Sequence, residues 1–471
     1  MKKSSFVLFL LLTSPFLGKG QATVHTFSED QLLWFVEKYH PLSQQADLLL
    51  KRGESTIRQA KGGFDPVLSG EFDQKSYDEK NYYSLLHGGL KIPTWYGVEV
   101  KTGYDQNSGI RLNPEDNVPS GGLWYGGVSV TLGNGLFIDQ RRATIKQAQI
   151  FAESTYAQQR QVMNDLYFDA LKAYWNWVEA YNQFSIYDES LNLAVDRFEA
   201  VKSSFRFGDK PAIDTLEAFI LVQNRQLHRS DYEVAYKNAT LALSNYLWFE
   251  NNTPLLITDS LIPVSITELP KLEVVTYDTL EASMLRLDWF HPEMQLYGFK
   301  LADMNIDRRL KSESLKPTVN VHYNVLNEPI GGSVISGLDA NNSKMGVSAG
   351  FPLFLRKQRG DLQLTDIKIQ ETQLSQQQKL LELQNTLRQF YNQQLVLASQ
   401  VELYTNSVAN SERLLAGERQ KFRAGESSVF MVNTRENYAI NARLKLIELI
   451  AKYHVYHKGV TWASGGLYSA N

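Results

Sequence analysis

Apolar residues recur along two very long stretches of the chain at spacings of three, four or seven residues. In residues 137–204 they include Ile145, Leu166 and Trp177, and no proline or glycine interrupts the pattern. A spacing near 3.5 is typical of helices packed as coiled coils. At about 1.5 Å per residue this helix would be roughly 100 Å long. A second such stretch, also without proline, covers residues 358–421.

Shorter segments before each long helix change to a period of two. These segments are 66–132 and 317–353, and turn residues such as glycine, asparagine and proline separate their alternating runs. The clearest runs read Val98-Glu99-Val100-Lys101-Thr102 and Val319-Asn320-Val321-His322-Tyr323. Alternation of this kind predicts strands with one apolar and one polar face.

The elements occur twice in the same order, which predicts a tandem structural repeat. The first repeat covers 23–250: a helix, strands, the long helix 137–204, a turn and a helix over 212–250. After a linker at 251–276, the second repeat covers 277–458. It has a helix, strands, the long helix 358–421, a turn and a helix over 429–458, and a loosely ordered tail is expected at 459–471. Short matches recur in order in the two repeats: His40-Pro41 with His291-Pro292, Gly127-Val128-Ser129 with Gly346-Val347-Ser348, Gln140-Arg141 with Gln358-Arg359, and Phe205-Arg206-Phe207-Gly208-Asp209 with Phe422-Arg423-Ala424-Gly425-Glu426.

The amino terminus predicts export. Residues 1–22 carry Lys2 and Lys3, then a short apolar core, then small residues, as in a secretory signal peptide. The 471-residue chain contains no cysteine, so disulfides do not contribute to its stability. Its net charge of −3 gives no electrostatic case for nucleic acid as a partner.

The alternating strands fit either a half-buried soluble sheet or a barrel wall with lipid outside and water inside. Export and strands of about nine to eleven residues favour the barrel wall. Four aromatic residues near strand ends are candidates for the membrane interface: Trp95, Tyr96, Trp124 and Tyr125. Two strands per repeat cannot close a barrel in one chain, and open edges are not tolerated in hydrocarbon. The pattern therefore predicts a homo-oligomer bounded by outer-membrane lipid.

The order of elements over the mature chain resembles the outer-membrane factor family, of which the TolC duct is the type member. The matching motifs are the arginine-containing starts of the long helices (Leu136-Phe137-Ile138-Asp139-Gln140-Arg141 and Pro352-Leu353-Phe354-Leu355-Arg356-Lys357-Gln358-Arg359) and the Phe-Arg-x-Gly turns. The resemblance implies an α+β membrane protein that is a homotrimer. Its copies would share a twelve-stranded barrel in the outer membrane of a Gram-negative bacterium, with a coiled-coil α-barrel in the periplasm. It further implies a passive exit duct for efflux or type I secretion that works with a periplasmic adaptor (a membrane fusion protein) and an inner-membrane RND or ABC pump.

The resemblance also implies roles for residues near the turns. Asp214 and Glu217 have the family's acidic spacing after the first turn and are candidates for the pore constriction, although first-turn acids also compensate the helix dipole. Met431 and Thr434 occupy the equivalent positions of the second repeat. The turns themselves are candidate adaptor contacts, with pure helix capping as the alternative: Phe205, Arg206, Gly208, Phe422, Arg423 and Gly425.

The two strand segments differ in length by about 32 residues. Pro66 lies 61 residues before Gly127, whereas Pro317 lies 29 residues before Gly346. The extra residues contain turn signals at Asp78-Glu79-Lys80-Asn81 and could form one additional hairpin, inside the wall or outside it.

The sequence contains no catalytic constellation. It has no P-loop and no nucleophile elbow, and no cofactor is expected. His454 and His457 lack further ligands at metal-site spacing, so we expect no metal there. The alternative to the exit duct is a periplasmic adaptor-type coiled-coil protein without a membrane barrel, but an adaptor should have one helical hairpin, and this sequence predicts two.

Overall fold

A computed structural model of the chain describes residues 25–258, 260–266, 272–328 and 341–468. The signal peptide expected over 1–22 lies outside these residues. The chain forms two compact units. Unit 1 combines the residues up to Phe35 with Ala173–Lys271 and Tyr404–Ala451, and unit 2 combines the intervening segments with the residues from Lys452 onward. Each unit takes segments from both halves of the sequence, so the halves do not form separate domains.

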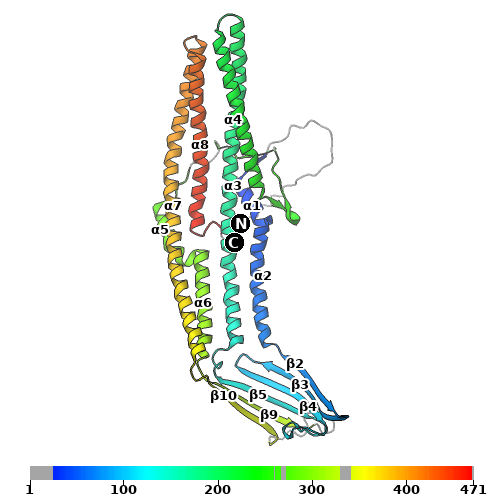
Figure 1. Cartoon of the computed structure of the whole chain (residues 1–471). Helices are drawn as coiled ribbons and strands as arrows, with labels where there is room; N and C mark the ends of the chain where they lie inside the picture. The colour runs from blue at the N-terminus through cyan, green and yellow to red at the C-terminus, as the bar shows by residue number, and fades with distance from the viewer. Residues whose placement is uncertain (1–24, 259, 267–271, 329–340, 469–471) are drawn as a thin grey trace, which may run out of the picture. The chain divides into compact units, whose positions relative to one another are not determined.

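The same order of helices and strands occurs in both halves of the chain (Figure 1). Two helices precede the strands of each half, and two longer helices follow them. In the described residues the helices are α1 (Glu29–Tyr39), α2 (Pro41–Lys61), α3 (Gln140–Arg206), α4 (Ala212–Ser244), α5 (Tyr277–Phe290), α6 (Pro292–Glu313), α7 (Arg356–Arg423) and α8 (Val429–Ala463). None of the described helices is long and apolar enough to cross a membrane.

The two His-Pro pairs separate helices. Pro41 and Pro292 are the first residues of α2 and α6, where the missing N–H of proline costs no helical hydrogen bond. The preceding histidine caps each helix through its side chain: His40 Nδ1 accepts from the N–H of Leu42 at 3.1 Å, and His291 Nδ1 accepts from that of Glu293 at 3.2 Å. The helical segment before each set of strands is therefore divided at its proline into two helices.

His291 makes the stability of unit 2 sensitive to acid. Burial, followed by the charges of Lys379 and Arg160, lowers the pKa of His291 from 6.5 to about 4. The folded state thus favours the neutral ring, and its stabilisation is present above pH 6.5 and is lost as the pH falls toward 4. We expect up to about 3 kcal/mol of unfolding free energy to be lost over this range.

The variant His291→Asn tests this expectation, because asparagine keeps a capping acceptor but does not titrate. Thermal unfolding of the variant should depend less on pH between 7 and 4 than that of the wild type. Equal pH dependence in the two proteins would contradict the assignment to His291.

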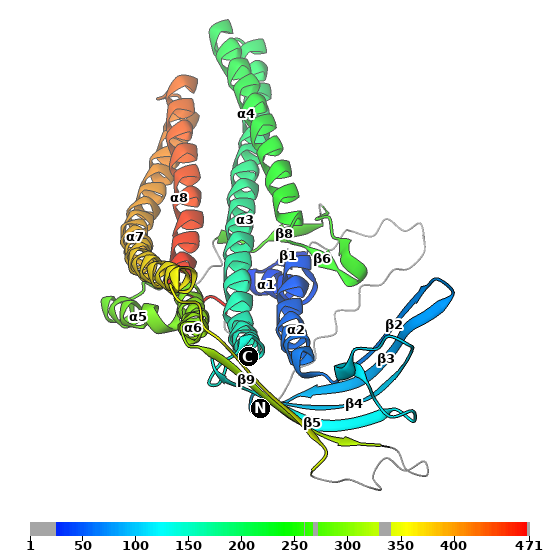
Figure 2. The same cartoon turned by 60° about the horizontal axis from the view of Figure 1, so that its bottom comes forward.

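Six strands of unit 2 form one antiparallel sheet in the order β10-β9-β5-β4-β3-β2. Figure 2 shows β2, β3, β4, β5 and β9 side by side in this order. Two small two-stranded sheets pair β1 (His25–Phe27) with β8 (Leu261–Pro263) and β6 (Trp248–Phe249) with β7 (Thr253–Pro254). The six strands are β2 (Val67–Tyr77), β3 (Lys80–Pro93), β4 (Val98–Ser108), β5 (Leu123–Gly133), β9 (Thr318–Asn327) and β10 (Ser343–Gly350).

The register of the sheet separates an apolar face from a polar face. Val347, Val321, Val130 and Val98 lie in one row across β10, β9, β5 and β4. Side chains alternate along each strand, so the polar residues between these valines lie on the other face. That polar face carries Glu71, Asp73, Lys75, His87, Lys91, Glu99, Lys101, Asp105, Ser129, Thr131, Asn320, His322, Asn324, Lys344 and Ser348.

The extra residues of the first half are part of this sheet. They form the hairpin of β2 and β3, which Asp78 and Glu79 close as a two-residue turn with φ of 56° and 54°. Strand β3 pairs with β4 from Ser84 to Pro93. The first half therefore contributes four strands and the second half two, instead of two each.

Hydrophobic clusters hold the helices of each unit together. In unit 1, Trp177 is fully buried on α3 and donates from Nε1 to Thr240 of α4 at 3.1 Å. In unit 2, α5, α6, α7 and the end of α8 share one cluster, formed by Leu280, Leu287, Met294, Leu383, Leu387, Tyr391, Val460 and Ala463.

The prediction of a loosely ordered tail from Gly459 onward is wrong for its first residues, because α8 continues to Ala463. Val460 and Ala463 are buried, and the ring of Trp462 stacks on Phe168 with 4.6 Å between the centroids. Gly459 does not end the helix. It lies against the ring of Phe390, where a Cβ atom has no room.

Candidate functional site

The two Phe-Arg-x-Gly turns have the same backbone geometry. Gly208 follows α3 with φ of 84°, and Gly425 follows α7 with φ of 80°. In each turn the glycine N–H donates to the phenylalanine carbonyl three residues earlier, and the next N–H donates five residues back, over 2.9–3.1 Å. This is the Schellman arrangement, which ends a helix with a residue in the left-handed region. Both turns lie at the same end of unit 1 (Figure 1).

The side chains of the two turns differ in exposure. Phe205 is 44 % exposed, and Arg206 and Arg423 are also exposed. Phe422 is half-buried against a cluster of Val201, Ala218 and Val429, and the Nζ atom of Lys210 lies 4.8 Å from its ring centroid. The first turn therefore offers an exposed phenylalanine, whereas the second uses its phenylalanine for packing.

Asp214 and Glu217 lie one turn apart on α4, so they share one side of the helix. Both are half-buried. Glu217 Oε1 accepts a hydrogen bond from Asn433 Nδ2 on α8 at 3.4 Å, and Asp214 lies in the first turn of α4, where a negative charge is favoured. The side chain of Thr434 donates to the backbone of its own helix.

A buried carboxylate joins three helices near these acids. Glu436 of α8 is 3 % exposed and receives two hydrogen bonds from Arg197 of α3, at 2.9 and 3.0 Å. Arg419 of α7 donates a third at 3.1 Å, and Arg197 also donates to Asn433 at 2.8 Å. A charge-assisted, two-pronged bond of this kind fixes both distance and orientation.

Glu436 is not among the residues predicted from the sequence, although its position carries a signal. It occupies the seam of α8 between Val429, Val432 and Ala439, at spacings of three and four where an apolar residue is expected. A charged residue at a seam position requires a partner, because an unpaired buried charge is costly.

Arg225 of α4 lies in the same region of unit 1. It is 4 % exposed and donates from Nη2 to Asn437 at 2.5 Å. Burial lowers the pKa of Arg225, and the opposing charge of Glu436 partly restores it. The buried Arg225, the half-buried Arg197 and the buried Glu436 therefore lie close together between α3, α4 and α8.

The four candidate interface aromatics lie at both ends of the sheet. Trp95 and Tyr96 are exposed in the turn between β3 and β4, where Trp95 stacks on Phe64 with 4.4 Å between centroids. Trp124 and Tyr125 start β5 at the opposite end and point to opposite faces. Trp124 lies on the apolar face, whereas Tyr125 lies on the polar face and stacks on His87.

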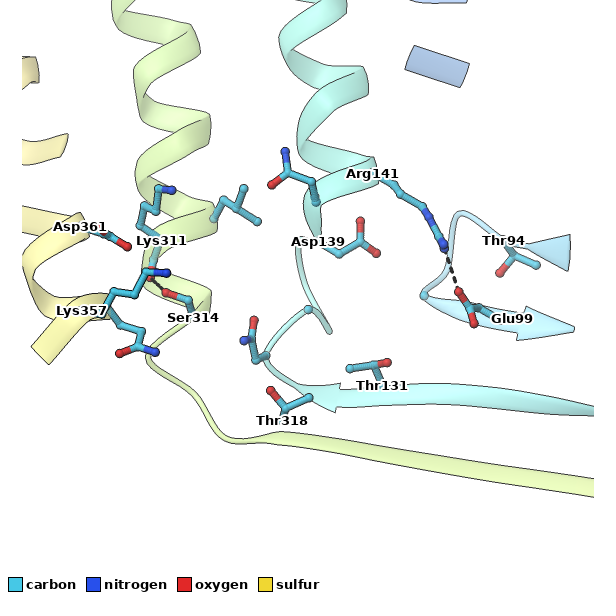
Figure 3. A pocket seen from close by; sticks show the side chains of 16 residues that line it. Thr94, Glu99, Thr131, Asp139, Arg141, Lys311, Ser314, Thr318, Lys357 and Asp361 are labelled. Carbon is cyan, nitrogen blue, oxygen red and sulfur yellow. Dashed lines mark hydrogen bonds and ion pairs between the residues drawn. The ribbon is translucent and has the colours of Figure 1, made fainter. Parts of the chain in front are cut away.

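A polar pocket of about 610 Å³ lies where α3, α6 and α7 meet the sheet (Figure 3). Glu99 on the polar face of β4 accepts from Arg141 of α3 at 2.9 Å and pairs with Lys91 at 2.9 Å. This contact gives the arginine at the start of the first long helix a structural role. Asp139, Lys311, Lys357 and Asp361 also line the pocket, so charges of both signs face it.

Within the described ranges, no group of three or more histidines, cysteines or acids could hold a metal ion. His454 lies inside unit 2, and burial followed by the charge of His457 lowers its pKa to about 3. A ring held neutral in this way fits packing within the helical core.

A family model identifies the family of the chain, and solved structures share its fold. The family model for outer membrane efflux proteins matches residues 110–247 and 292–460. Among solved structures, the MtrE outer membrane channel of Neisseria gonorrhoeae is 13% identical with a TM-score of 0.69, and the match covers 93% of this chain and 89% of that one. The outer membrane protein VceC of Vibrio cholerae is 13% identical with a TM-score of 0.65 over 93% and 96% of the chains. CusC is 15% identical with a TM-score of 0.67 over 94% and 93%. No protein in a search of curated sequences matches.

The fold is therefore the α+β fold of outer-membrane channels, and the chain belongs to the outer membrane efflux protein family. It is an outer-membrane exit duct of the TolC-like class, and its helical part lies in the periplasm. Its relatives are channels rather than enzymes.

Proposed function

We propose that the two halves are tandem repeats and that three copies of the chain close a shared β-barrel in the outer membrane, continued by a periplasmic tunnel of coiled helices. The observation that carries this proposal is the six-stranded sheet with one apolar face, one polar face and two open edges. Hydrocarbon does not tolerate an open edge, because unpaired backbone groups find no water there. Neighbouring copies supply the missing pairing, with apolar side chains toward lipid and polar ones toward the lumen.

The helices offer a second argument for assembly. Helix α4 exposes apolar side chains at spacings of three, four and then seven residues: Ile213, Leu216, Ile220, Leu227, Val234 and Leu241. An exposed apolar stripe with heptad spacing is typical of a helix that packs against another helix. A neighbouring copy is the partner that a closed helical tunnel provides.

The duct supplies no energy of its own, so it needs partners. We assign the exposed parts of the two turns, chiefly Phe205, Arg206 and Arg423, to contact with a periplasmic adaptor that links the duct to an inner-membrane pump of the RND or ABC class. Phe422 supports the turn from inside. In the sheet of unit 2, we assign Trp95, Tyr96 and Trp124 to the two membrane interfaces and Tyr125 to the lumen.

Light scattering of the detergent-solubilised protein tests the assembly. The full chain has a mass of 53.7 kDa, and the mature chain lacks the signal peptide expected over 1–22. The protein mass after subtraction of bound detergent should be about three times that of the mature chain. A monomer that is soluble without detergent would reject the proposal.

Asp214 and Glu217 are proposed to line the constriction of the tunnel. Three copies of each place like charges close together, which favours occupancy by cations. Replacing both, as Asp214→Asn with Glu217→Gln, should weaken block by divalent cations in planar-bilayer conductance about tenfold or more. Glu199→Gln, an exposed acid of α3, is the matched control and should leave the block as in the wild type. Unchanged block in the double variant removes these acids from the constriction.

A further inference from the structure

The hairpin of β2 and β3 changes which strands can meet between copies. Its first strand, β2, forms one edge of the sheet, and β10 forms the other. In a sheet of four strands without this hairpin, β4 would be an edge strand. In this chain, β4 is instead paired with β3 over ten residues of β3, from Ser84 to Pro93.

From this arrangement we infer that the seam between copies joins β2 of one chain to β10 of the next and that the barrel has eighteen strands, three sets of six, instead of twelve. The inference rests on the proposed trimer and specifies its interface. The partner at each open edge is a second copy of this chain.

The direction of the strands fits this seam. Each neighbouring pair within the sheet is antiparallel, and five such steps separate β2 from β10. The two edge strands therefore run in opposite directions, so β2 and β10 of different copies meet as an antiparallel pair. The resulting number of strands is even, so antiparallel pairing continues around the whole closed barrel.

The faces of the hairpin continue those of the rest of the sheet. Leu68 and Phe72 of β2 pair with Leu90 and Leu86 of β3 on the apolar face, where Leu68 is 81 % exposed and Phe72 is 61 % exposed. The other face of β2 carries Glu71, Asp73 and Lys75. A hairpin outside the membrane has no need for an apolar face in line with a barrel wall, and a hairpin in the wall requires one.

Exposure and charge also fit the two edges to each other. All residues of β2 are exposed, and β10 is exposed apart from Gly346. If the helix-side ends Val67 and Gly350 are level, Ser69 lies opposite Ser348 and Asp73 opposite Lys344, with each pair on the polar face. The seam then brings an acid of one copy to a lysine of the next.

Disulfide trapping tests the seam, because the native chain has no cysteine. Within one chain β2 and β10 are five strand spacings apart, about 24 Å, which no disulfide can bridge. The paired variants Asp73→Cys with Lys344→Cys and Ser69→Cys with Ser348→Cys should therefore form links between chains only. After oxidation of the purified protein in detergent, a covalent trimer resistant to SDS and sensitive to reductant is expected. To allow for a shifted register, further pairs are made between the two strands. Each of Ser69→Cys, Glu71→Cys and Asp73→Cys on β2 is combined with each of Lys344→Cys and Ser348→Cys on β10.

Two further variants make the test decisive. Ser69→Cys with Val347→Cys places the thiols on opposite faces and should not cross-link. Lys101→Cys with Ser348→Cys reports a seam between β4 and β10, as expected for a twelve-stranded barrel with the hairpin displaced. Links from β10 to β4, or trimers without links from β10 to β2 in any combination, overturn the inference while the trimer stands. If light scattering before oxidation finds no trimer, the proposed function itself fails, and the seam with it.

Discussion

Replacing Glu436 with glutamine is expected to be among the most destabilising single changes in unit 1. The carboxylate is buried and receives three hydrogen bonds from Arg197 and Arg419. A neutral amide cannot balance these cations, and breaking a buried ion pair from one side costs roughly 3–5 kcal/mol. The melting temperature of Glu436→Gln in detergent, followed by circular dichroism, should fall by several degrees, and exchange of the α8 amides should become faster.

Glu189→Gln is the matched control for this experiment. Glu189 also joins α3 to α8, through Arg443 at 3.1 Å, but its side chain is 56% exposed. Exposed pairs contribute only about 0–1 kcal/mol, so this variant should melt close to the wild type. If the two variants melt alike, the buried network does not hold unit 1 together.

The helices were the most predictable part of the fold. Their apolar residues follow the 3.5 spacing for many turns, and prolines lie outside them. The local pattern alone therefore predicts the first and last residues of α3 and α7 closely. The end of α8 was less predictable. Gly459 resembles a helix stop, but the contact with Phe390 that requires a glycine comes from a segment about 70 residues earlier and leaves no local trace.

The sheet was predictable in its alternation but not in its extent. The runs around Val98 and Val319 have the apolar–polar pattern of a two-faced strand, whereas the middle of β2 reads Ser69-Gly70-Glu71-Phe72-Asp73, with a single large apolar residue among small and charged ones. Its place in the sheet is set by backbone pairing with β3 rather than by its own pattern. Pairing across strands is not visible in a single sequence.

The backbone of the two turns was predictable from the sequence, whereas the buried network around Glu436 was not. The turns at Gly208 and Gly425 follow from a local rule about left-handed residues. The partner of Glu436 on α3 lies 239 residues earlier in the chain. Only the packing of the two helical hairpins brings these residues together, and the sequence gives no measure of their relative register.

The double variant Gly208→Val with Gly425→Val is expected to block export while trimers persist. Both glycines have φ near +80°, a region that β-branched residues rarely adopt. A Cβ at either position meets no atom within 4 Å, so the strain is confined to the turn backbone and amounts to about 1–3 kcal/mol per site. The turns should change shape and lose adaptor contact while the clusters of unit 1 stay intact. Dye retention in cells that depend on this duct measures export, and light scattering measures assembly.

Gly417→Val is the control that separates the effect of distorting the turn from the effect of introducing a valine. Gly417 lies inside α7, eight residues before Gly425, and a Cβ there also meets open space. Its backbone is not in the left-handed region, so valine is tolerated and cells should retain no more dye than the wild type. Loss of trimers in the double variant would assign the turns to folding rather than to docking. Normal export with intact trimers would show that the Schellman geometry is not needed for the contact with the adaptor, because the strained turn would then still be recognised.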